Sequence, residues 1–174
     1  MPWPLPNAIE GGLDMNFEEY DLTIPEGCNA ILGHSHFIKT AEDLYEAMVN
    51  GSGNVKFGLA FSEASGPCLV RVEGNEDSLK ALAAKTLMDI GCGHTFIIYL
   101  KNAFPVNFLR AIKSVPEVCN IHCATANPLR IIIARTELGG AITGIVDGAA
   151  PKGIEKEIDI AARKKFLRDI GYKR

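Results

Sequence analysis

The sequence contains no hydrophobic run long enough to cross a membrane and no marked excess of charge. No stretch approaches the roughly 20 apolar residues of a membrane-spanning helix, and the N-terminus lacks a basic flank followed by an apolar core, so we expect neither membrane insertion nor export. The net charge is −3, whereas a surface that binds a nucleic-acid backbone needs a dense excess of Lys and Arg. These features predict a cytoplasmic protein without a nucleic-acid partner.

The usual nucleotide-binding motifs are missing as well. There is no G-x-x-x-x-G-K-[ST] loop and no G-x-G-x-x-G after a strand, because the glycine-rich stretch 139–144 is followed by Ile145 and Val146 instead of a lysine. The motifs of protein kinases are absent too. A P-loop enzyme, a Rossmann enzyme and a protein kinase are therefore disfavoured.

The cysteines are odd in number, which predicts free thiols instead of a disulfide framework. They are Cys28, Cys68, Cys92, Cys119 and Cys123. Regular alternation along a strand over 118–124 would place Cys119, Ile121 and Cys123 on one face and His122 on the other. We therefore expect Cys119 and Cys123 to be buried thiols, not metal ligands.

The length and composition fit one folded domain. The chain has 174 residues, of which 47% are hydrophobic and 22% charged. We expect residues 1–19 to form an extended arm, because the opening is rich in Pro and Gly, and residues 20–174 to form the domain. Apolar patterns predict strands at 20–25, 30–38, 56–62, 68–73, 94–100, 118–124, 130–136 and 141–146.

Four helices are expected between and after these strands. Thr40, with Asp43 in a capping box, is expected to begin the first helix and Asn75 to cap the second, and a short helix follows Pro105. The last helix is amphipathic and covers 154–169. Adjacent strands mixed with helical crossovers predict a mixed α/β (α+β) fold, a mixed sheet covered by helices.

The histidines are the main candidates for chemistry. His94 follows two glycines, Gly91 and Gly93, at a helix-to-strand junction where the backbone can approach a ligand. A neutral imidazole there can attack a phosphorus centre, although a histidine that only bonds a loop carbonyl fits the same position. His34 and His36 form an H-x-H pair on one strand face, a spacing that suits zinc or copper but supplies only two ligands.

Four segments resemble the adenosine-specific kinase family. They are HFIKTAEDLYEA (36–47), FSEASG (61–66), the Gly-Cys-Gly-His stretch that leads into HTFIIYL, and VPEVCNIHCATANP (115–128). The resemblance runs from about residue 22 to residue 173. It implies that the protein binds adenosine or AMP, that a phosphorylated histidine is involved, and that copies of the chain assemble into a homotrimer.

The residues and the resemblance together suggest a phosphotransferase that uses ATP and Mg²⁺. His94 would carry the phosphate, and Glu63 would act as a general base or position Mg²⁺. The expected substrate-binding residues are His36, Lys39, Ser65, Gly66, Asn127, Arg135 and Asp147. No metal site is expected.

Three positions depart from the family pattern. His34 stands where a glutamine is common, Arg135 where a Glu is expected, and Gly140 where a basic residue is expected. If that basic residue contacts phosphate, this chain has lost the contact or moved it to Arg135.

Two other functions stay open at this point. A non-catalytic nucleotide-binding or regulatory protein would have the same pocket without ATP-dependent phosphorylation of adenosine. A metal or redox protein built on His34, His36 and the cysteines would contain stoichiometric metal when purified.

Overall fold

The computed structural model describes residues 16–174. Residues 1–15, most of the expected arm, lie outside the described residues, while residues 16–19 belong to the first strand. The elements are β1 (Asn16–Leu22), β2 (Cys28–Ser35), α1 (Thr40–Gly51), β3 (Lys56–Ser62), β4 (Val70–Gly74), α2 (Asp77–Ile90), β5 (Thr95–Lys101), the 3-10 turn η1 (Pro105–Asn107), α3 (Leu109–Lys113), β6 (Val118–Thr125), β7 (Leu129–Thr136), β8 (Gly139–Asp147) and α4 (Glu157–Asp169).

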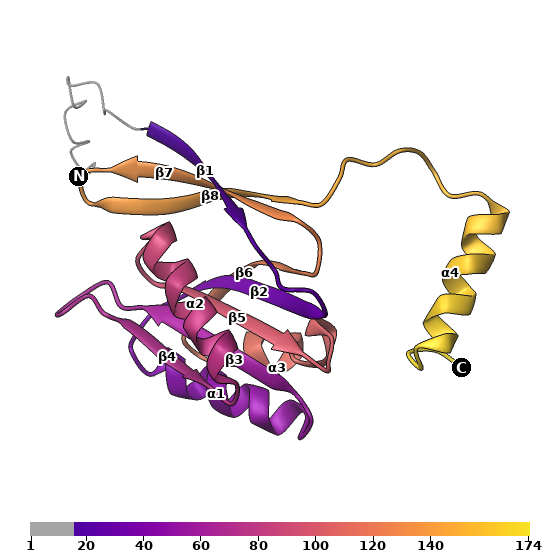
Figure 1. Cartoon of the computed structure of the whole chain (residues 1–174), viewed down its shortest axis with the longest axis horizontal. Coiled ribbons are helices and arrows are strands. Elements are labelled where there is room, and N and C mark those ends of the chain that lie inside the picture. The colour runs from indigo at the N-terminus through magenta and orange to yellow at the C-terminus, as the bar shows by residue number, and fades with distance from the viewer. Residues whose placement is uncertain (1–15) are drawn as a thin grey trace, which may run out of the picture.

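The strands form two sheets (Figure 1). The larger sheet has the order β4-β3-β5-β2-β6 and the smaller one β1-β7-β8. Every pairing between these strands is antiparallel. The predicted mixed α+β class and the single domain are confirmed. The sequence predicted one mixed sheet, whereas the strands form two antiparallel sheets, because local periodicity carries no information on which strands pair.

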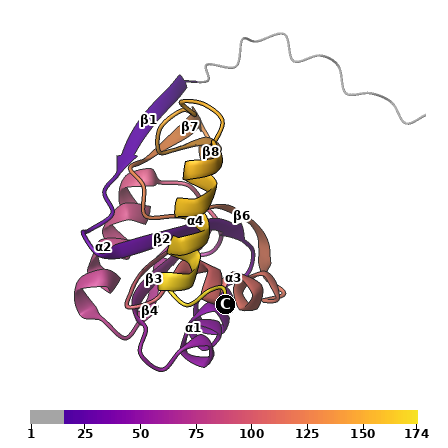
Figure 2. The ribbon, with the colours of Figure 1, turned by 90° about the vertical axis from the view of Figure 1, so that its right-hand side faces the viewer.

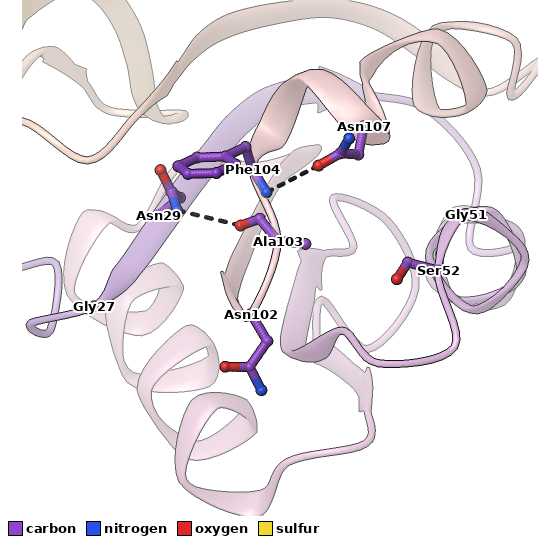
Figure 3. Close-up of a pocket in the computed structure, with 8 residues that line it drawn as sticks. All are labelled: Gly27, Asn29, Gly51, Ser52, Asn102, Ala103, Phe104 and Asn107. Atoms are coloured by element: carbon purple, nitrogen blue, oxygen red, sulfur yellow. Dashed lines mark hydrogen bonds between the residues drawn. The ribbon is translucent and has the colours of Figure 1, made fainter. Parts of the chain in front are cut away.

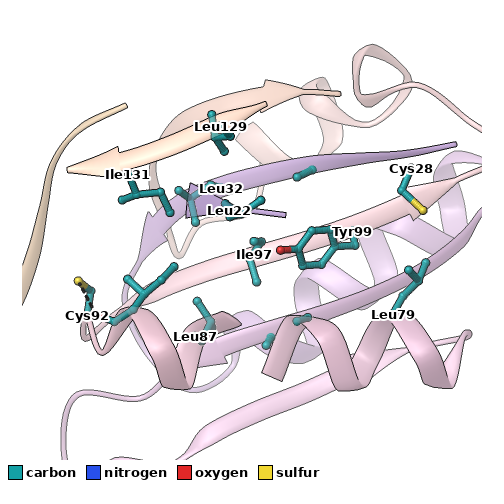
Figure 4. Close-up of a cluster of buried hydrophobic side chains, with 14 of the residues drawn as sticks. Leu22, Cys28, Leu32, Leu79, Leu87, Cys92, Ile97, Tyr99, Leu129 and Ile131 are labelled. Carbon is teal, nitrogen blue, oxygen red and sulfur yellow. Dashed lines mark hydrogen bonds between the residues drawn. The ribbon is translucent and has the colours of Figure 1, made fainter. Parts of the chain in front are cut away.

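Two apolar cores hold the layers together. One lies between the larger sheet and a second layer made of α2 and the smaller sheet; Figure 4 shows Leu22, Leu129 and Ile131 reaching it from the smaller sheet. The other core lies on the opposite face of the larger sheet, under α1 and α3. The central strand β5 contributes alternate residues to both cores, so its run of apolar residues follows from burial on both faces.

Two predicted helix caps take other partners. Thr40 is the first residue of α1, and its hydroxyl donates to the carbonyls of His36 (3.0 Å) and Phe37 (2.7 Å) instead of capping the next turn. Asn75 precedes the N-cap residue Glu76. Its side-chain amide accepts from Phe57 N and donates to Val55 O, both at 2.9 Å. Both predicted caps were wrong: the Thr40 hydroxyl binds carbonyls of the residues just before the helix, and the Asn75 amide binds backbone groups about 20 residues away in the chain.

The last helix stands apart from both sheets in Figure 1 and lies on the side of the molecule that faces the viewer in Figure 2. α4 has no buried residue, and the segment 149–156 that leads to it has no regular structure. Its far end touches the body through Tyr172, whose hydroxyl lies 3.1 Å from Asn107 Oδ1 and whose ring meets Phe104. Its apolar side chains, among them Ile158 and Phe166, stay exposed. Within residues 16–174, no helix is both long enough and apolar enough to cross a membrane.

Candidate functional site

His94 is held in an unusual backbone conformation at the entry to β5. Its φ is 55°, in the left-handed region, which costs a residue with a Cβ about 1 to 2 kcal/mol. Two hydrogen bonds fix it there: its N–H donates to Ser62 O at 2.8 Å, and its carbonyl accepts from Ser35 N at 2.9 Å. His94 is thus clamped between β3 and β2, and its side chain is only half-buried. Such conformations persist where surrounding structure imposes them, often at functional sites.

Aromatic rings surround the imidazole of His94. It stacks on the fully buried Phe61, with ring centroids 5.9 Å apart and an interplanar angle of 15°. The ring of His34 meets it edge-on, at 6.1 Å and 70°. His34 was left without a role by the sequence, yet the structure brings it to His94.

A third histidine extends this group. Burial lowers the pKa of His34, and the nearby His94 lowers it further. Burial likewise lowers the pKa of His122, with a smaller contribution from His34. His34 and His122 are therefore neutral imidazoles at neutral pH. We call His34, His94 and His122 the histidine row.

The histidine row lines two neighbouring cavities beneath the β7–β8 hairpin. His34 and His94 line one of about 360 Å³, together with Ala64, Thr136 and Leu138. His34 and His122 line the other, of about 290 Å³, with Cys92 and Asn120. Both cavities share His34, Gly93, Gly140 and Ala141. The larger one falls within the range of about 300 to 1,000 Å³ that small-molecule sites occupy.

Two irregularities in β6 place His122 at the cavity. In the pairing with β2, the register shifts between Leu32 and Gly33 and again between His34 and Ser35, so His122 and Cys119 have no direct partner. These bulges break the strict alternation that the sequence predicted. Ile121 packs against the core under α1, whereas Cys123 packs against the other core. The prediction that Cys119, Ile121 and Cys123 share a face was therefore wrong, and Cys119 is exposed instead of buried.

Arg135 occupies the space that a side chain at position 140 would need. A Cβ on Gly140 would lie 2.4 Å from Arg135 Nη1 and 2.9 Å from Cys92 Sγ. Arg135 Nη1 donates to Ile90 O at 2.6 Å, at the C-terminus of α2, and Nε donates to Glu18 Oε2 at 2.8 Å. The departures from the family pattern at positions 135 and 140 are thus linked, because the Arg135 side chain fills the space beside Gly140. Arg135 binds carbonyls at a helix end, which leaves it less free to contact phosphate.

The glycines before His94 have separate roles. Gly91 ends α2 in the left-handed conformation, with φ 58°, and its N–H donates to Leu87 O. Gly93 leaves room for Ala64, because a Cβ on Gly93 would lie 2.9 Å from the Ala64 Cβ. This contact brings the 63–68 loop against the His94 turn.

The 63–68 loop carries three of the predicted site residues. Glu63 accepts from Arg71 Nη2 at 2.6 Å, and its side chain is only 13% exposed. Arg71 was not identified from the sequence, although it is the cation that neutralises Glu63. Ser65 and Gly66 are exposed at the loop tip. The structure thus places this loop beside His94, but Glu63 is engaged in an ion pair.

His36 and Lys39 lie outside the two cavities. His36 is exposed after the end of β2, and its N–H donates to Glu117 O. Lys39 Nζ lies 2.7 Å from Asp43 and 2.7 Å from the buried Glu117. Only one oxygen of Glu117 is paired, since its Oε2 is buried without a partner. His34, not His36, is therefore the strand histidine that reaches His94.

Asn127 and Asp147 form a separate group. Asp147 Oδ1 accepts from Asn127 Nδ2 at 3.0 Å and from Thr125 Oγ1 at 2.8 Å. Thr125 pairs with Ala30, four residues along β2 from His34, which is about 13 Å at the rise of a strand. These two predicted residues therefore lie at the opposite end of the larger sheet from His94.

Another cavity, of about 510 Å³, lies at that far end and is shown in Figure 3. Asn29, Asn102 and Asn107 line it with Phe104, and it contains no ionisable side chain. Ser52 supplies the one side-chain hydroxyl in its lining, and no acid or base among the lining residues could activate that hydroxyl as a nucleophile. Among residues 16–174, no group of three or more His, Cys, Asp and Glu side chains is placed to hold a metal ion. The histidine row is thus the group best suited to chemistry.

Comparisons with known proteins agree with the segments that the sequence singled out. Residues 20–173 match the family model described as adenosine specific kinase. Among solved structures, the chain is similar to the PH1918 protein from Pyrococcus horikoshii OT3, with 42% identity and a TM-score of 0.87. The match covers 92% of this chain and 99% of that chain. No curated protein matches the sequence.

Proposed function

This chain belongs to the adenosine-specific kinase family, and we propose that it binds adenosine or AMP beside His94 and transfers a phosphoryl group through that histidine. Family membership supports an adenosine-related function. The observation that supports phosphoryl transfer is the position of His94, which is held in a left-handed conformation at a cavity of about 360 Å³.

The cavity walls suit a nucleoside. Ala64, Leu138 and Ala141 offer apolar surface on which a purine can lie, and Thr136 and the turn glycines supply polar backbone. Leu138, at the tip of the β7–β8 hairpin, is fully exposed. An exposed leucine at the edge of a cavity is well placed to cover an aromatic ligand.

The proposed transfer has two displacements at phosphorus. The neutral nitrogen of His94 gives its lone pair to the γ-phosphorus of ATP, while the bond to the bridging oxygen breaks and its electron pair leaves with ADP. The 5′-hydroxyl oxygen of adenosine then bonds to phosphorus as the P–N bond breaks and its electron pair returns to the imidazole. The hydroxyl proton passes to Glu63 and then to solvent. The products are ADP, AMP and one proton.

We propose ATP as the phosphate donor, with Mg²⁺ bound chiefly by its phosphates. Mg²⁺ in such sites takes one or two protein carboxylates and keeps several waters. The 63–68 loop offers Glu63, whose Oε2 is already paired with Arg71. The chain therefore supplies at most one carboxylate near His94, and no step of the transfer is assigned to the metal.

Intact-mass spectrometry tests this proposal. The purified protein is incubated with ATP and Mg²⁺, alone and with adenosine, and the modified residue is located by fragmentation at neutral pH. We expect one added phosphate on His94 with ATP alone and its loss, with AMP formed, when adenosine is added. Binding of adenosine without any added phosphate under either condition would reject the transfer and retain the binding.

A non-catalytic adenosine- or AMP-binding protein is the second candidate. It is favoured by the placement of the two predicted phosphate contacts: Lys39 is bound to Asp43 and Glu117, and Arg135 to Glu18 and to carbonyls. A site without a free cation stabilises a developing phosphoryl charge poorly. The mass experiment separates the two functions.

We further propose that the protein acts as a cytoplasmic homo-oligomer, a trimer by family resemblance. Support comes from α4, which has no buried residue and leaves Ile158 and Phe166 exposed within the described part of the chain. His36, Lys39, Asn127 and Asp147 would then contact the ligand only if an adjoining copy brings them to a shared site. This arrangement would reconcile the predicted binding residues with their separation in one chain.

A further inference from the structure

The two cavities at the histidine row contain no fixed positive charge. Their lining includes three histidines but no lysine or arginine. The cations nearby are already engaged, since Arg135 pairs with Glu18 and Lys39 with Asp43 and Glu117. A phosphate that enters this site loses hydration, and the loss must be offset by charge or by hydrogen bonds. Imidazole is the one side chain on the walls that can become a cation near neutral pH.

The free protein keeps two of these imidazoles neutral. Burial lowers the pKa of His34 and of His122, and the mutual repulsion of the histidines lowers each further. A bound anion offsets the repulsion between the histidines, because a negative charge within a few ångströms favours the protonated ring and so raises its pKa. Ligand charge and protonation of the row are therefore linked.

His34 is central to this linkage. It faces His94 and Thr95 from the β5 side, Asn120 and His122 from β6, and Ala141 and Ile142 from β8, with the neutral Cys92 thiol beside them. None of these neighbours is an acid that would hold a proton on His34 in the absence of ligand. Arg135 lies behind Gly140 and Cys92 and opposes protonation.

We propose that the histidine row, with His34 at its centre, is a proton-dependent phosphate site, so that AMP binding takes up a proton whereas adenosine binding does not. This inference rests on the proposed nucleoside site and adds to it the means of recognising the phosphate. It also assigns a role to His34, which an uncharged amide at that position could not perform.

Calorimetry measures the number of protons taken up when each ligand binds. AMP and adenosine are titrated into the protein at about pH 7.5 in buffers that differ in ionisation enthalpy. We expect uptake of up to one proton per AMP and none per adenosine. In the range between the free and the bound pKa of His34, AMP affinity should rise by up to about tenfold per pH unit of acidification. Equal proton uptake for both ligands, or none for either, would overturn the inference.

One control separates proton uptake by the protein from protonation of the ligand. The phosphate of AMP titrates near pH 6 itself, so inorganic sulfate, which stays a dianion, is used as a competitor of AMP between about pH 6 and 8.5. The inhibition constant of sulfate, corrected for the AMP affinity measured at each pH, should be smaller at the lower pH. A sulfate inhibition constant that does not change with pH would show that the histidines gain no charge.

Two variants test whether His34 is the residue that takes up the proton. His34→Gln keeps a hydrogen-bonding side chain but cannot gain charge, and it should flatten the pH dependence of the ratio of AMP to adenosine affinity. Lys113→Gln removes an exposed charge on α3, outside both cavities, and should keep that dependence. If the ratio of AMP to adenosine affinity still depends on pH in His34→Gln, His34 is not the residue that takes up the proton. If adenosine itself does not bind, the proposed function fails; if adenosine binds and the ratio is independent of pH in the unmutated protein, only this inference fails.

Discussion

At the scale of single residues, the site is determined by backbone constraints as much as by side-chain chemistry. His94 adopts a left-handed conformation because Ser62 and Ser35 bind its N–H and its carbonyl. The stacking of its ring on the buried Phe61 restricts the imidazole further. In the transfer that we propose, an imidazole fixed in this way needs little reordering before it attacks, which lowers the entropy cost of that step.

The first prediction concerns His94→Gln. Glutamine cannot form a phosphoramidate but keeps hydrogen-bonding capacity, so the variant should lose the ATP-dependent mass addition. Adenosine affinity should stay within about tenfold, or 1.4 kcal/mol, because the apolar walls are intact. His36→Gln is the matched control and should still accept phosphate. Phosphate on His36, with His94→Gln fully modified, would show that the wrong histidine was chosen.

The second prediction concerns the thiols. Burial raises the pKa of Cys123 to about 11 and raises that of Cys28 and Cys92 as well, so these three should react slowly with a thiol reagent at about pH 8. Cys68 and Cys119 are exposed and should react quickly. Peptide mapping after brief labelling of the native protein checks both statements. Slow labelling of Cys119 would mean that an adjoining copy or a ligand covers β6.

At the scale of elements, the sequence predicted where most of the strands lie in the chain but not which strands pair. The strand over 56–62 and the helix that ends at Ile90 follow from local periodicity, and the structure has both. The bulges in β6 and the hydrogen bonds of Asn75 depend on partners distant in the chain. The proximity of His34 to His94 was missed for the same reason, although both residues were candidates.

The packing of α2 on β3 gives an element-scale prediction. A Cβ on Gly58 would lie 2.1 Å from Lys80 N and 2.2 Å from Leu79 C, which are backbone atoms that cannot move independently. Gly58→Ala should therefore destabilise the protein by about 3 kcal/mol or more, at the upper end of overpacking effects. Gly53→Ala, whose Cβ would meet no atom within 4 Å, is the control and should change the free energy of unfolding little. Urea denaturation monitored by circular dichroism measures both.

At the scale of the whole molecule, α4 is the element that one chain leaves incomplete. An isolated helix of 13 residues is marginal in water, and surface ion pairs such as Lys165–Asp169 add only a few tenths of a kcal/mol. Ile158 is 77% exposed and Phe166 59%. A helix with such side chains in water would gain stability by packing against another copy, as in the homo-oligomer that we propose, and an exchanged arm is one route to a symmetric oligomer.

The last prediction follows from that exposure. Ile158→Glu combined with Phe166→Glu places two charges on the apolar face of α4, and we expect the mass in solution, measured by light scattering after size exclusion, to fall from that of an oligomer to that of one chain. The larger sheet and its cores do not depend on α4, so far-ultraviolet circular dichroism should lose at most the helical signal of α4 itself. Lys164→Gln, an exposed change on the same helix, should leave the mass unaltered. An unmutated protein that is already monomeric would reject the oligomer. An oligomer that survives the double substitution would place the interface elsewhere, and the exposed side chains of the β7–β8 hairpin would be the next to test.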